Sequence, residues 1–435
     1  MRELVLIVDD EPGIVTELTN ILHDEGYRVA ATGRGEEAIE IYIRERPAVV
    51  FLDIWLPDRD GLETLQALKQ IDPAAAVIMM SGHGTTPTAV RAIKMGAENY
   101  LEKPFTLAQV VESVATALAA REKRVSEQPA PRIESGVFRL EPVQQLAPPP
   151  MLSIVRESDI PQRTVKESMV IYGLGLHSGA RTGMAIQPLP PDSGIHFVTV
   201  PSGTEIPAYL SSVADTEWAT TLSRYGDSIK TTEHLLASLH AAGITNLLVK
   251  VHGEIPVLDG SAVEFCNHLA AIGIVDQDRP RRELVVDQRY EITGSNGRSL
   301  VIEPAEVLSV RYELRYPAPI GEQQCDFTLT SFEAFRAEIA PARTFGFLRD
   351  LPMLAELGIG AGGRLDNCIL VGEDKVINTE LRFPDEYARH KVLDIIGDLY
   401  LLGYPVRGRV SARWTGHRDN IALQQLILAQ SSGQG

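Results

Sequence analysis

The sequence predicts a doubly wound parallel α/β domain, then a proline-rich linker, then a second folded region that mixes strands and helices. In the first region the apolar runs LVLIVDD, AVVFLDI and AVIMMSG alternate with amphipathic segments such as GEEAIEIYIRER, which is typical of parallel strands joined by helices. Residues 122–158 are rich in Pro, Gln, Ser and Glu, which is typical of linkers. Beyond them the alternating run RTGMAIQPL and the helical run TTEHLLASLHAAG indicate that ordered structure resumes. We therefore expect one domain at residues 1–121 and a second folded region at residues 159–430.

Composition and charge limit the class of protein. The 435 residues suffice for about two or three domains, and a hydrophobic content of 44% predicts packed globular structure. The net charge of -17 argues against broad contact with nucleic acid or with an anionic membrane surface. No apolar run reaches the roughly 18 residues that a transmembrane segment needs, and MRELVLIVDDEP places acids where a signal peptide would stay apolar.

The cysteines give no sign of a disulfide frame or of a cysteine metal site. Cys266, Cys325 and Cys368 lie far apart, and one of them is necessarily unpaired. A reducing compartment suits this usage, so we expect a cytoplasmic location.

Polar residues end the apolar runs of the first region. Asp9 and Asp10 end the first run, Asp53 the second and Ser81 the third, and Lys103 follows a later run. The carboxyl ends of parallel strands meet at one edge of the sheet, so these side chains should gather there. Three carboxylates would bind a hard cation such as Mg2+, an aspartate can form an acyl phosphate, and a lysine can pair with the phosphoryl group. Any one of these acids alone would be an ordinary loop residue, but the ordered set predicts a phosphorylatable aspartate.

The same set resembles the receiver domain of two-component response regulators. The motifs DD, LDIWLPDRDG, MMSGHGT and EKP carry the resemblance across residues 3–118 and look most like receivers of the NtrX type. It implies a flavodoxin-like fold, phosphorylation of Asp53 through a cognate histidine kinase, and the option of a receiver-mediated dimer. The implied site residues are Asp9, Asp10 and Asp53 for Mg2+, Ser81 and Lys103 as phosphoryl sensors, and Tyr100 as the aromatic switch residue. Such receivers usually precede an ATPase and a DNA-binding module, but the chain lacks the Walker A pattern GxxxxGK[ST], so its output should differ.

The segment RHKVLDIIGD carries polar residues four apart within an apolar run. On a helix Glu386, His390, Asp394 and Asp398 form one narrow stripe between apolar neighbours, so this face should be enclosed. Enclosed histidine and carboxylate groups need partners, and a His–Asp pair at i and i+4 can share one metal ion. Taken alone, the pair is as often structural as metal-binding.

A catalytic zinc site usually needs a third protein ligand. The histidines weighed for that role are His177, His234, His240, His268 and His417. His234 stands out because it follows Glu233 at a predicted helix start in KTTEHLLASL, which would place a base beside a ligand. On residue pattern alone, a Glu-His pair at a helix start more often lies in solvent on the protein surface, so the choice of the third ligand stays open.

Residues 161 to about 430 resemble the LpxC family of zinc-dependent deacetylases, which act on UDP-3-O-acyl-N-acetylglucosamine in lipid A biosynthesis. The stretches that carry the resemblance are PQRTVKESMVIYGLGLHSG, TTEHLLASLHAAGITN, EIPVLDGSA, ARTFGFLRD, LRFPDEYARHKVLDIIGDLYLLG and the late GH. It implies an α+β sandwich of two subdomains, whose helices face each other around the zinc site. We expect the subdomains at residues 159–281 and 282–430.

The resemblance also assigns roles to single residues. The implied zinc ligands are His234, His390 and Asp394. Glu233 is the implied general base, His417 the general acid hydrogen-bonded to Asp398, and Thr344 the oxyanion contact. Lys391 would meet a substrate phosphate, and Phe345, Phe347 and His177 would line the substrate site. The chain departs from the family at WATTL, which lacks the cysteine of some members, and at Arg364, where a serine often follows the paired glycines.

Three functions follow from these observations. The first is an active deacetylase regulated by phosphorylation of Asp53. The alternative is a signalling protein whose deacetylase-like half only binds the nucleotide sugar or a protein partner. The third is an active enzyme whose receiver serves dimerisation or localisation. Zinc content separates the first from the second.

Overall fold

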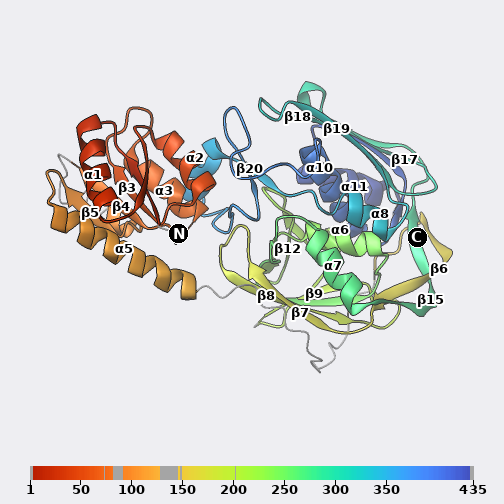
Figure 1. Cartoon of the computed structure of the whole chain (residues 1–435). Helices are drawn as coiled ribbons and strands as arrows, with labels where there is room; N and C mark the ends of the chain where they lie inside the picture. Colours follow the sequence, from red (N-terminus) through yellow and green to blue (C-terminus); the bar gives the residue numbers. More distant parts are fainter. Residues whose placement is uncertain are drawn as a thin grey trace. The chain divides into compact units, whose positions relative to one another are not determined.

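The computed structural model describes residues 3–72, 74–81, 92–127, 146, 149–200 and 202–431 (Figure 1). The chain forms two compact units. Unit 1 comprises Met1–Pro131, Gly346–Leu365 and Ile369–Glu380, and unit 2 comprises Arg132–Phe345, Asp366–Cys368 and Leu381–Gly435.

Unit 1 is built on a five-stranded parallel sheet with the strand order β2-β1-β3-β4-β5, the order of flavodoxin-like folds. The strands are β1 (Leu4–Val8), β2 (Arg28–Thr32), β3 (Val49–Asp53), β4 (Val77–Ser81) and β5 (Asn99–Glu102). The helices are α1 (Pro12–Asp24), α2 (Gly35–Glu45), α3 (Gly61–Ile71) and α5 (Leu107–Glu127).

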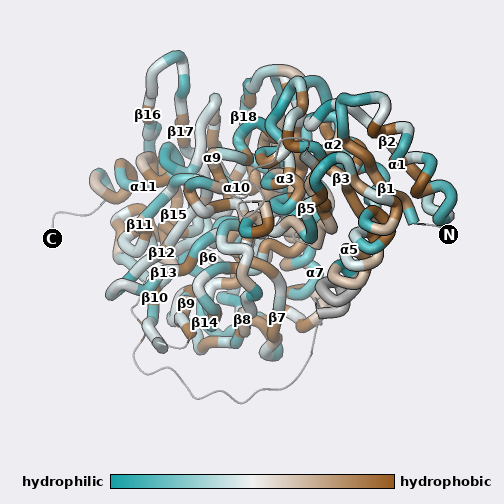
Figure 2. The backbone as a smooth tube through the Cα atoms, turned by 90° about the vertical axis from the view of Figure 1, so that its left-hand side faces the viewer, coloured by the Kyte–Doolittle hydropathy of each residue, from teal (hydrophilic) through white to brown (hydrophobic). Residues whose placement is uncertain are grey.

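Helices cover both faces of this sheet because its central strands are apolar on both sides. Val5 and Ile7 of β1 pack toward α1 and α5, while Leu6 and Val8 pack toward α2 and α3. In Figure 2 helix α5 shows apolar and polar residues in turn along its length, as a helix lying on a sheet should. The doubly wound fold predicted from the alternating apolar runs is confirmed.

Unit 1 also contains residues 346–365 and 369–380, which we call the excursion. The excursion carries η3 (Leu348–Asp350), α9 (Leu351–Glu356) and β21 (Ile369–Val371), which pairs with β20 (Phe345–Phe347). By sequence it belongs to the predicted region 282–430, yet its apolar residues pack into the core of unit 1. This packing was not expected from the sequence.

Unit 2 contains two large sheets. The first has the order β10-β9-β14-β8-β7 and the second has the order β16-β17-β23-β18-β19. The first sheet comprises β7 (Met169–Leu174), β8 (Arg181–Pro188), β9 (Ile195–Thr199), β10 (Glu205–Pro207) and β14 (Leu247–Val251). The second comprises β16 (Tyr290–Thr293), β17 (Ser299–Glu303), β18 (Ser309–Arg315), β19 (Glu322–Thr328) and β23 (Arg409–Arg413).

Smaller elements complete unit 2. A sheet of order β22-β15-β6 comprises β6 (Val155–Val165), β15 (Ile274–Val285) and β22 (Val406–Arg407), and another of order β11-β12-β13 comprises β11 (Val213–Asp215), β12 (Thr221–Arg224) and β13 (Asp227–Ile229). The α-helices are α6 (Glu233–Ala242), α7 (Val263–Ile272), α8 (Phe332–Glu338), α10 (Glu386–Leu399) and α11 (His417–Ser431). The 3₁₀ turns are η1 (Leu210–Ser212), η2 (Ser295–Gly297) and η4 (Tyr400–Leu402).

Two helices, each packed against one of the large sheets, contact each other inside unit 2. Leu235, Leu236 and Leu239 of α6 pack into the core of the first sheet, whereas α10 lies against β18 and β19 of the second. Helices α6 and α10 also pack against each other (Figure 1). The sandwich of two sheets with facing helices is therefore confirmed.

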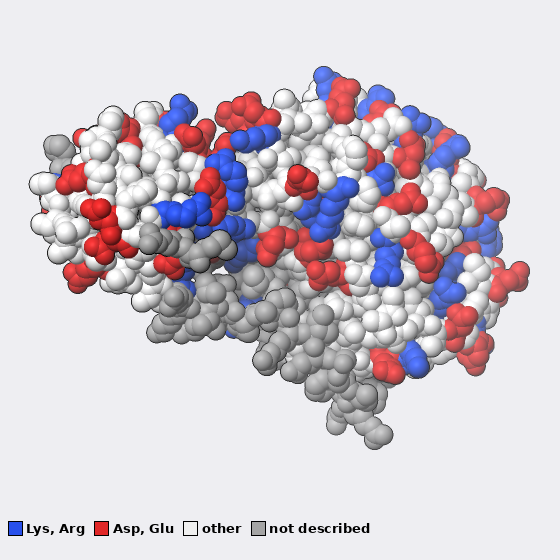
Figure 3. All heavy atoms as spheres, in the orientation of Figure 1, with Lys and Arg blue, Asp and Glu red and all other residues white. Residues whose placement is uncertain are grey.

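Only some of the predicted domain limits fall within the described residues. Residues 122–127 continue helix α5, and residues 128–145 and 147–148 of the predicted linker 122–158 lie outside the described residues. The subdomain limit at residue 281 falls inside the continuous strand β15 and stays a prediction. Among the described residues, no helix is long and apolar enough to cross a membrane. On the face of unit 2 drawn in Figure 3, acidic and basic side chains are interspersed.

Candidate active site and phosphoacceptor pocket

Three helices of unit 2 bring the predicted catalytic residues together. Glu233 and His234 begin α6, His390 and Asp394 lie one turn apart on α10, and His417 begins α11. Glu233, His234, His390 and Asp394 are all buried. The narrow polar stripe predicted on RHKVLDIIGD is therefore enclosed by protein.

His234, His390 and Asp394 form a cluster with the geometry of a metal site. One ligand atom from each lies within 4.8 Å of the others. The Nε2 atoms of His234 and His390 lie 3.9 and 3.6 Å from Oδ1 of Asp394. Tetrahedral zinc with ligands at about 2.0–2.1 Å would hold them about 3.4 Å apart. Oδ1 of Asp394 is buried and accepts no hydrogen bond among the described residues, which suits an atom that binds a cation.

The neighbours of this cluster orient it for a cation. Nδ1 of His390 lies 3.1 Å from the carbonyl oxygen of Ala342, so it carries the hydrogen and leaves Nε2 free to bind a metal. Burial lowers the pKa of His234 to about 3 and also lowers the pKa of His390, which keeps both rings neutral. Although burial would raise the pKa of Asp394, the Lys391 ammonium 2.9 Å away and the charge of His417 lower it.

Glu233 and His417, the predicted general base and general acid, flank the cluster. Nε2 of His417 lies 3.9 Å from Glu233 and 3.8 Å from Asp394. Burial raises the pKa of Glu233 to about 7, with Asp394 and Asp398 raising it further against the opposing charge of His417. Burial would lower the pKa of His417, but Asp398, Asp394 and Glu233 together raise it to about 10. At neutral pH a group poised to take a proton therefore faces a group poised to give one.

Asp398 holds His417 with the help of two residues that sequence reasoning missed. Oδ2 of Asp398 accepts hydrogen bonds from Nδ1 of His417 and Nδ2 of Asn420, both at 2.8 Å. Oδ1 accepts a hydrogen bond of 2.6 Å from the hydroxyl of Thr220, whose own N–H donates to Glu233. Thr220 lies in WATTL, where the sequence drew attention only to the absence of a cysteine.

Gly397 sets the distance between the two ligand-bearing helices. A Cβ atom there would lie 2.1 Å from the carbonyl oxygen of Glu233, so only glycine allows α6 and α10 to approach this closely. The glycine was visible in IIGD, but nothing in one sequence says that another backbone lies against it.

Other predicted residues occupy different places. Glu386, the first member of the stripe, is fully buried in a salt bridge with Arg343 at 2.9 Å and does not join the metal cluster. His240, weighed as a ligand, is held by the carbonyl of Ile396 at 2.8 Å and the N–H of Val406 at 3.2 Å, which leaves it neither ring nitrogen for a metal. His268 lies on α7 outside the metal cluster.

Only some of the predicted substrate-lining residues lie beside the His234, His390 and Asp394 cluster. The ring of Phe345 lies edge-on to Tyr387 at 4.9 Å and 6.2 Å from the ring of His390, with Nζ of Lys391 5.8 Å from its centre. Thr344 precedes it and donates its N–H to the carbonyl of Gly260. Phe347 belongs to the excursion in unit 1, where Arg349 stacks on its ring.

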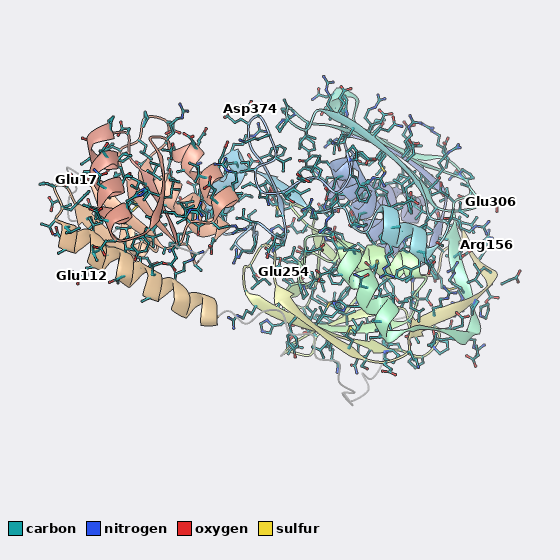
Figure 4. The ribbon with its side chains drawn as sticks, viewed as in Figure 1. Glu17, Glu112, Arg156, Glu254, Glu306 and Asp374 are labelled. Atoms are coloured by element: carbon teal, nitrogen blue, oxygen red, sulfur yellow. The ribbon has the colours of Figure 1, made fainter. Side chains whose placement is uncertain are left out.

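Glu254 anchors the loop that carries His177, and sequence reasoning missed it. Its carboxylate accepts the N–H groups of His177 and Ser178 at 2.8 and 3.0 Å, and the hydroxyl of Thr231 at 3.1 Å. Glu254 is labelled in Figure 4. Both ring nitrogens of His177 are buried without a hydrogen bond among the described residues. Burial lowers the pKa of His177, and the charges of Lys230 and His417 lower it further, while the Glu254 carboxylate opposes them.

Several basic side chains of unit 2 that could meet the nucleotide phosphates are engaged in ion pairs. Arg389 pairs with Asp385 at 2.7 Å, and Arg413 pairs with Glu313 at 2.8 Å. Lys391 is paired with Asp394 inside the site itself.

In unit 1 the predicted acidic pocket forms at the carboxyl edge of the sheet. Asp9, Asp10 and Asp53 offer oxygens within 4.8 Å of one another, and Asp9 and Asp53 are buried. Nζ of Lys103 reaches Asp9 at 2.7 Å and Asp53 at 3.4 Å. Burial raises the pKa of Asp53 to about 6, and Asp9 adds to this effect while Lys103 opposes it. Burial would lower the pKa of Lys103, but the carboxylates around it raise it.

The two other predicted sensors lie on neighbouring strands. Ser81 ends β4 fully buried, and its carbonyl accepts the N–H of Lys103. Tyr100 on β5 packs against the core, and its hydroxyl is buried without a hydrogen bond among the described residues. The rest of the predicted motif SGHGT, residues 82–85, lies outside the described residues.

Comparison with known proteins assigns both regions. Residues 162–429 match the family model of UDP-3-O-acyl N-acetylglycosamine deacetylase (LpxC), and residues 5–115 match that of the response regulator receiver domain. A UDP-3-O-acyl-N-acetylglucosamine deacetylase from Anaeromyxobacter dehalogenans is 44% identical over 62% of this chain and 87% of its own length. That of Helicobacter pylori strain 26695 is 36% identical over 62% of this chain and 92% of its own length.

Solved structures similar to the chain cover its N-terminal region. The receiver domain of NtrX from Brucella abortus is 39% identical over 26% of this chain and 98% of that chain, with a TM-score of 0.26. The beryllofluoride-activated NtrC4 receiver domain is 37% identical over 27% of this chain and 98% of that chain, with a TM-score of 0.27. The chain belongs to the LpxC deacetylase family and carries a response-regulator receiver domain ahead of its deacetylase domain.

Proposed function

We propose that the protein is a zinc-dependent hydrolase that removes the acetyl group of UDP-3-O-acyl-N-acetylglucosamine, a step of lipid A biosynthesis, and that phosphorylation of Asp53 regulates it. The observation that carries the proposal is the buried trio His234, His390 and Asp394 with a base on one side and an acid on the other. The names of the relatives supply the substrate. We place the reaction in the cytoplasm.

The residues present fit a zinc ion. Two neutral imidazoles and one ionised carboxylate are a common ligand set for catalytic zinc, and they leave a fourth position for water or substrate. When bound, zinc supplies a Lewis acid that lowers the pKa of a water molecule and polarises the acetamide carbonyl. His234, His390 and Asp394 are the ligands in this proposal.

The chain's own residues handle the protons. Glu233 accepts a proton from the attacking water, whose oxygen forms a bond to the acetyl carbon. Thr344 offers its hydroxyl to the oxyanion that develops on the carbonyl oxygen. His417 donates the proton on Nε2 to the sugar nitrogen as the C–N bond breaks, which yields acetate and the free amine. Asp398 keeps Nδ1 of His417 protonated and oriented throughout.

Substrate binding falls to residues around this centre. Lys391 would neutralise a phosphate of the nucleotide, and Phe345, Phe347 and His177 would contact the nucleotide sugar. In the free protein Lys391 forms an ion pair with Asp394, so a substrate phosphate would compete with Asp394 for the Lys391 ammonium.

In the receiver, Asp53 is the proposed phosphoacceptor. An oxygen of its carboxylate attacks the phosphorus of a phosphohistidine in the cognate kinase, and the P–N bond breaks. Asp9, Asp10 and Asp53 would hold Mg2+, which neutralises the phosphoryl oxygens. Lys103 and Ser81 would then contact the phosphoryl group, and Tyr100 would change its position in response. The close contact of Lys103 with Asp9 and Asp53 supports this assignment.

The experiment is acetate release by the full-length protein, with zinc content measured on the same sample. Phosphoramidate with Mg2+ serves as phosphodonor because it releases no acetate of its own. Turnover that changes with the donor, and does not in Asp53→Ala, is the expected result. Zinc-loaded protein without turnover would leave a binding module. Turnover indifferent to the donor would leave an enzyme whose receiver serves assembly or location.

A further inference from the structure

We propose that the α2–α3 face of the receiver is an interaction surface for the excursion, and that this contact carries the phosphorylation state of Asp53 to the deacetylase site. The partner is thus a segment of the same chain's deacetylase domain. The inference rests on the proposed function, because it assumes both the phosphorylation and the hydrolysis.

The contact is apolar and closed to solvent. Leu348, Leu365 and Leu370 of the excursion are each less than 10% exposed and belong to one cluster with the buried residues of α2 and α3. Leu351 and Ile377 pack against the same cluster, and helix α9 lies against α3. These residues therefore extend the hydrophobic cluster of unit 1 and are not isolated surface contacts.

Helices α2 and α3 carry buried apolar residues on a second face, in addition to the face that packs on the sheet. The sheet of unit 1 needs only one apolar stripe from each helix, yet Ile41 on α2 and Ala67 on α3 are also buried, about a quarter of a turn or more away from that stripe. At the rim of the contact, Nζ of Lys375 lies 2.7 Å from a carboxylate oxygen of Glu40. Lys375 follows Asp374, which is labelled on the excursion in Figure 4.

The start of helix α3 packs directly against the backbone of the phosphoacceptor Asp53 and of Ile54. Its first residue, Gly61, donates its N–H to the carbonyl of Ile54 at 2.8 Å. A Cβ atom on Gly61 would lie 2.0 Å from the carbonyl oxygen of Asp53, so the helix start rests on the backbone of that residue. Any adjustment of the β3–α3 connection around a phosphoryl group therefore moves the helix that holds α9.

The other end of the connection is the covalent chain. Leu348, in the receiver-side cluster, is three residues from Phe345, which packs beside His390 and Lys391. The chain passes between the units again on either side of residues 366–368 and after Glu380. The excursion is thus tied at several points to the domain that holds the catalytic residues, so a shift of α9 reaches Phe345 through a short, β-paired segment.

The test is a charge-reversal cycle at the rim of the interface. Glu40→Lys and Lys375→Glu each replace attraction by repulsion, and the double variant restores an opposite pair. The matched control is Glu17→Lys, the same charge change at an exposed position of α1, on the other face of the sheet (Figure 4). None of the three positions belongs to the proposed catalytic or binding residues.

The first readout is the ratio of turnover with phosphoramidate and Mg2+ to turnover without them. Each single reversal should move this ratio toward one by about two- to five-fold, the range expected for a surface ion pair, and the double variant should recover it. Glu17→Lys should keep the wild-type ratio. The second readout is amide hydrogen exchange over residues 348–356, which should quicken in both single variants and slow again in the double variant.

The outcomes separate this inference from the function on which it rests. A wild-type ratio of one would overturn both the regulation and this inference, and would leave the deacetylase activity untouched. A wild-type ratio different from one that survives both single reversals, with unchanged exchange over 348–356, would overturn this inference alone.

Discussion

Replacing Asp398 by asparagine tests how the site keeps His417 charged. In the native chain Asp398 accepts hydrogen bonds from His417, Asn420 and Thr220. An asparagine can keep its oxygen toward His417 and Asn420 and turn its NH2 group to Thr220, whose hydroxyl can accept. Shape and hydrogen bonding are then retained, and the negative charge alone is lost.

The expected size of the effect follows from that charge. Against the lowering effect of burial, Asp398 is the largest of the influences that raise the pKa of His417 to about 10. An opposite charge at this distance shifts a pKa by about 1–3 units. In the proposed mechanism the acid form of His417 is the active one, so turnover should be lost as pH rises through its pKa. The basic limb of the pH profile should therefore move down by about 1–3 units in Asp398→Asn. A bound cation lowers the limb in both proteins, so their difference is the quantity to compare.

The assay is kcat/KM for acetate release between about pH 6 and pH 11, with zinc content measured for each protein. Asp287→Asn makes the same chemical change away from the catalytic centre, where Asp287 accepts a hydrogen bond from Tyr290, and should leave the profile unchanged. A basic limb of Asp398→Asn that coincides with the wild-type limb, at normal zinc content, would refute the role given to this carboxylate.

Three further predictions follow from the same contacts. Asp394→Ala should lose zinc and turnover while far-UV circular dichroism stays native, with a lower melting temperature because Lys391 is left unpaired; full activity would contradict the ligand assignment. Gly397→Ala should push α6 away from α10 and cost about 2 kcal/mol or more of unfolding free energy in urea titrations, and native stability would show that the close approach is not needed. Phosphorylation of Asp53 by phosphoramidate should increase as pH rises through about 6, because the carboxylate is the nucleophile, and Mg2+ should move this rise to lower pH; a flat profile by phosphate-affinity electrophoresis would contradict the raised pKa.

The sequence predicts well those features that depend on periodicity along one element. The stripe on RHKVLDIIGD is a property of one helix, and Asp9, Asp53 and Ser81 end successive strands of one parallel sheet, so spacing alone places them. The choice of His234 over His240 is different. Both lie on α6, and although Glu233 draws attention to His234, only the hydrogen bonds of His240 to Ile396 and Val406 exclude His240 as a ligand. Resemblance to a family made that choice, whereas spacing left it open.

Features that depend on contact between distant elements were not predictable from one sequence. Thr220 donates a hydrogen bond to Asp398, which lies 178 residues away in the sequence, and no local pattern in WATTL predicts this contact. Glu386 shares the spacing of the stripe but pairs with Arg343, because burial beside a guanidinium decides its partner. The excursion reads as part of the deacetylase domain because it is continuous with it, and only the packing of Leu348, Leu365 and Leu370 places it in unit 1.

The most direct test of the central claim is acetate release from UDP-3-O-acyl-N-acetylglucosamine by the purified chain, measured after chelation and again after titration with zinc. The proposed function predicts that turnover disappears with the metal and returns in proportion to zinc up to one ion per deacetylase site, and that it does not return in His390→Ala. Turnover that survives complete removal of zinc, or that returns equally in His390→Ala, would contradict the assignment of His234, His390 and Asp394 as the catalytic metal site.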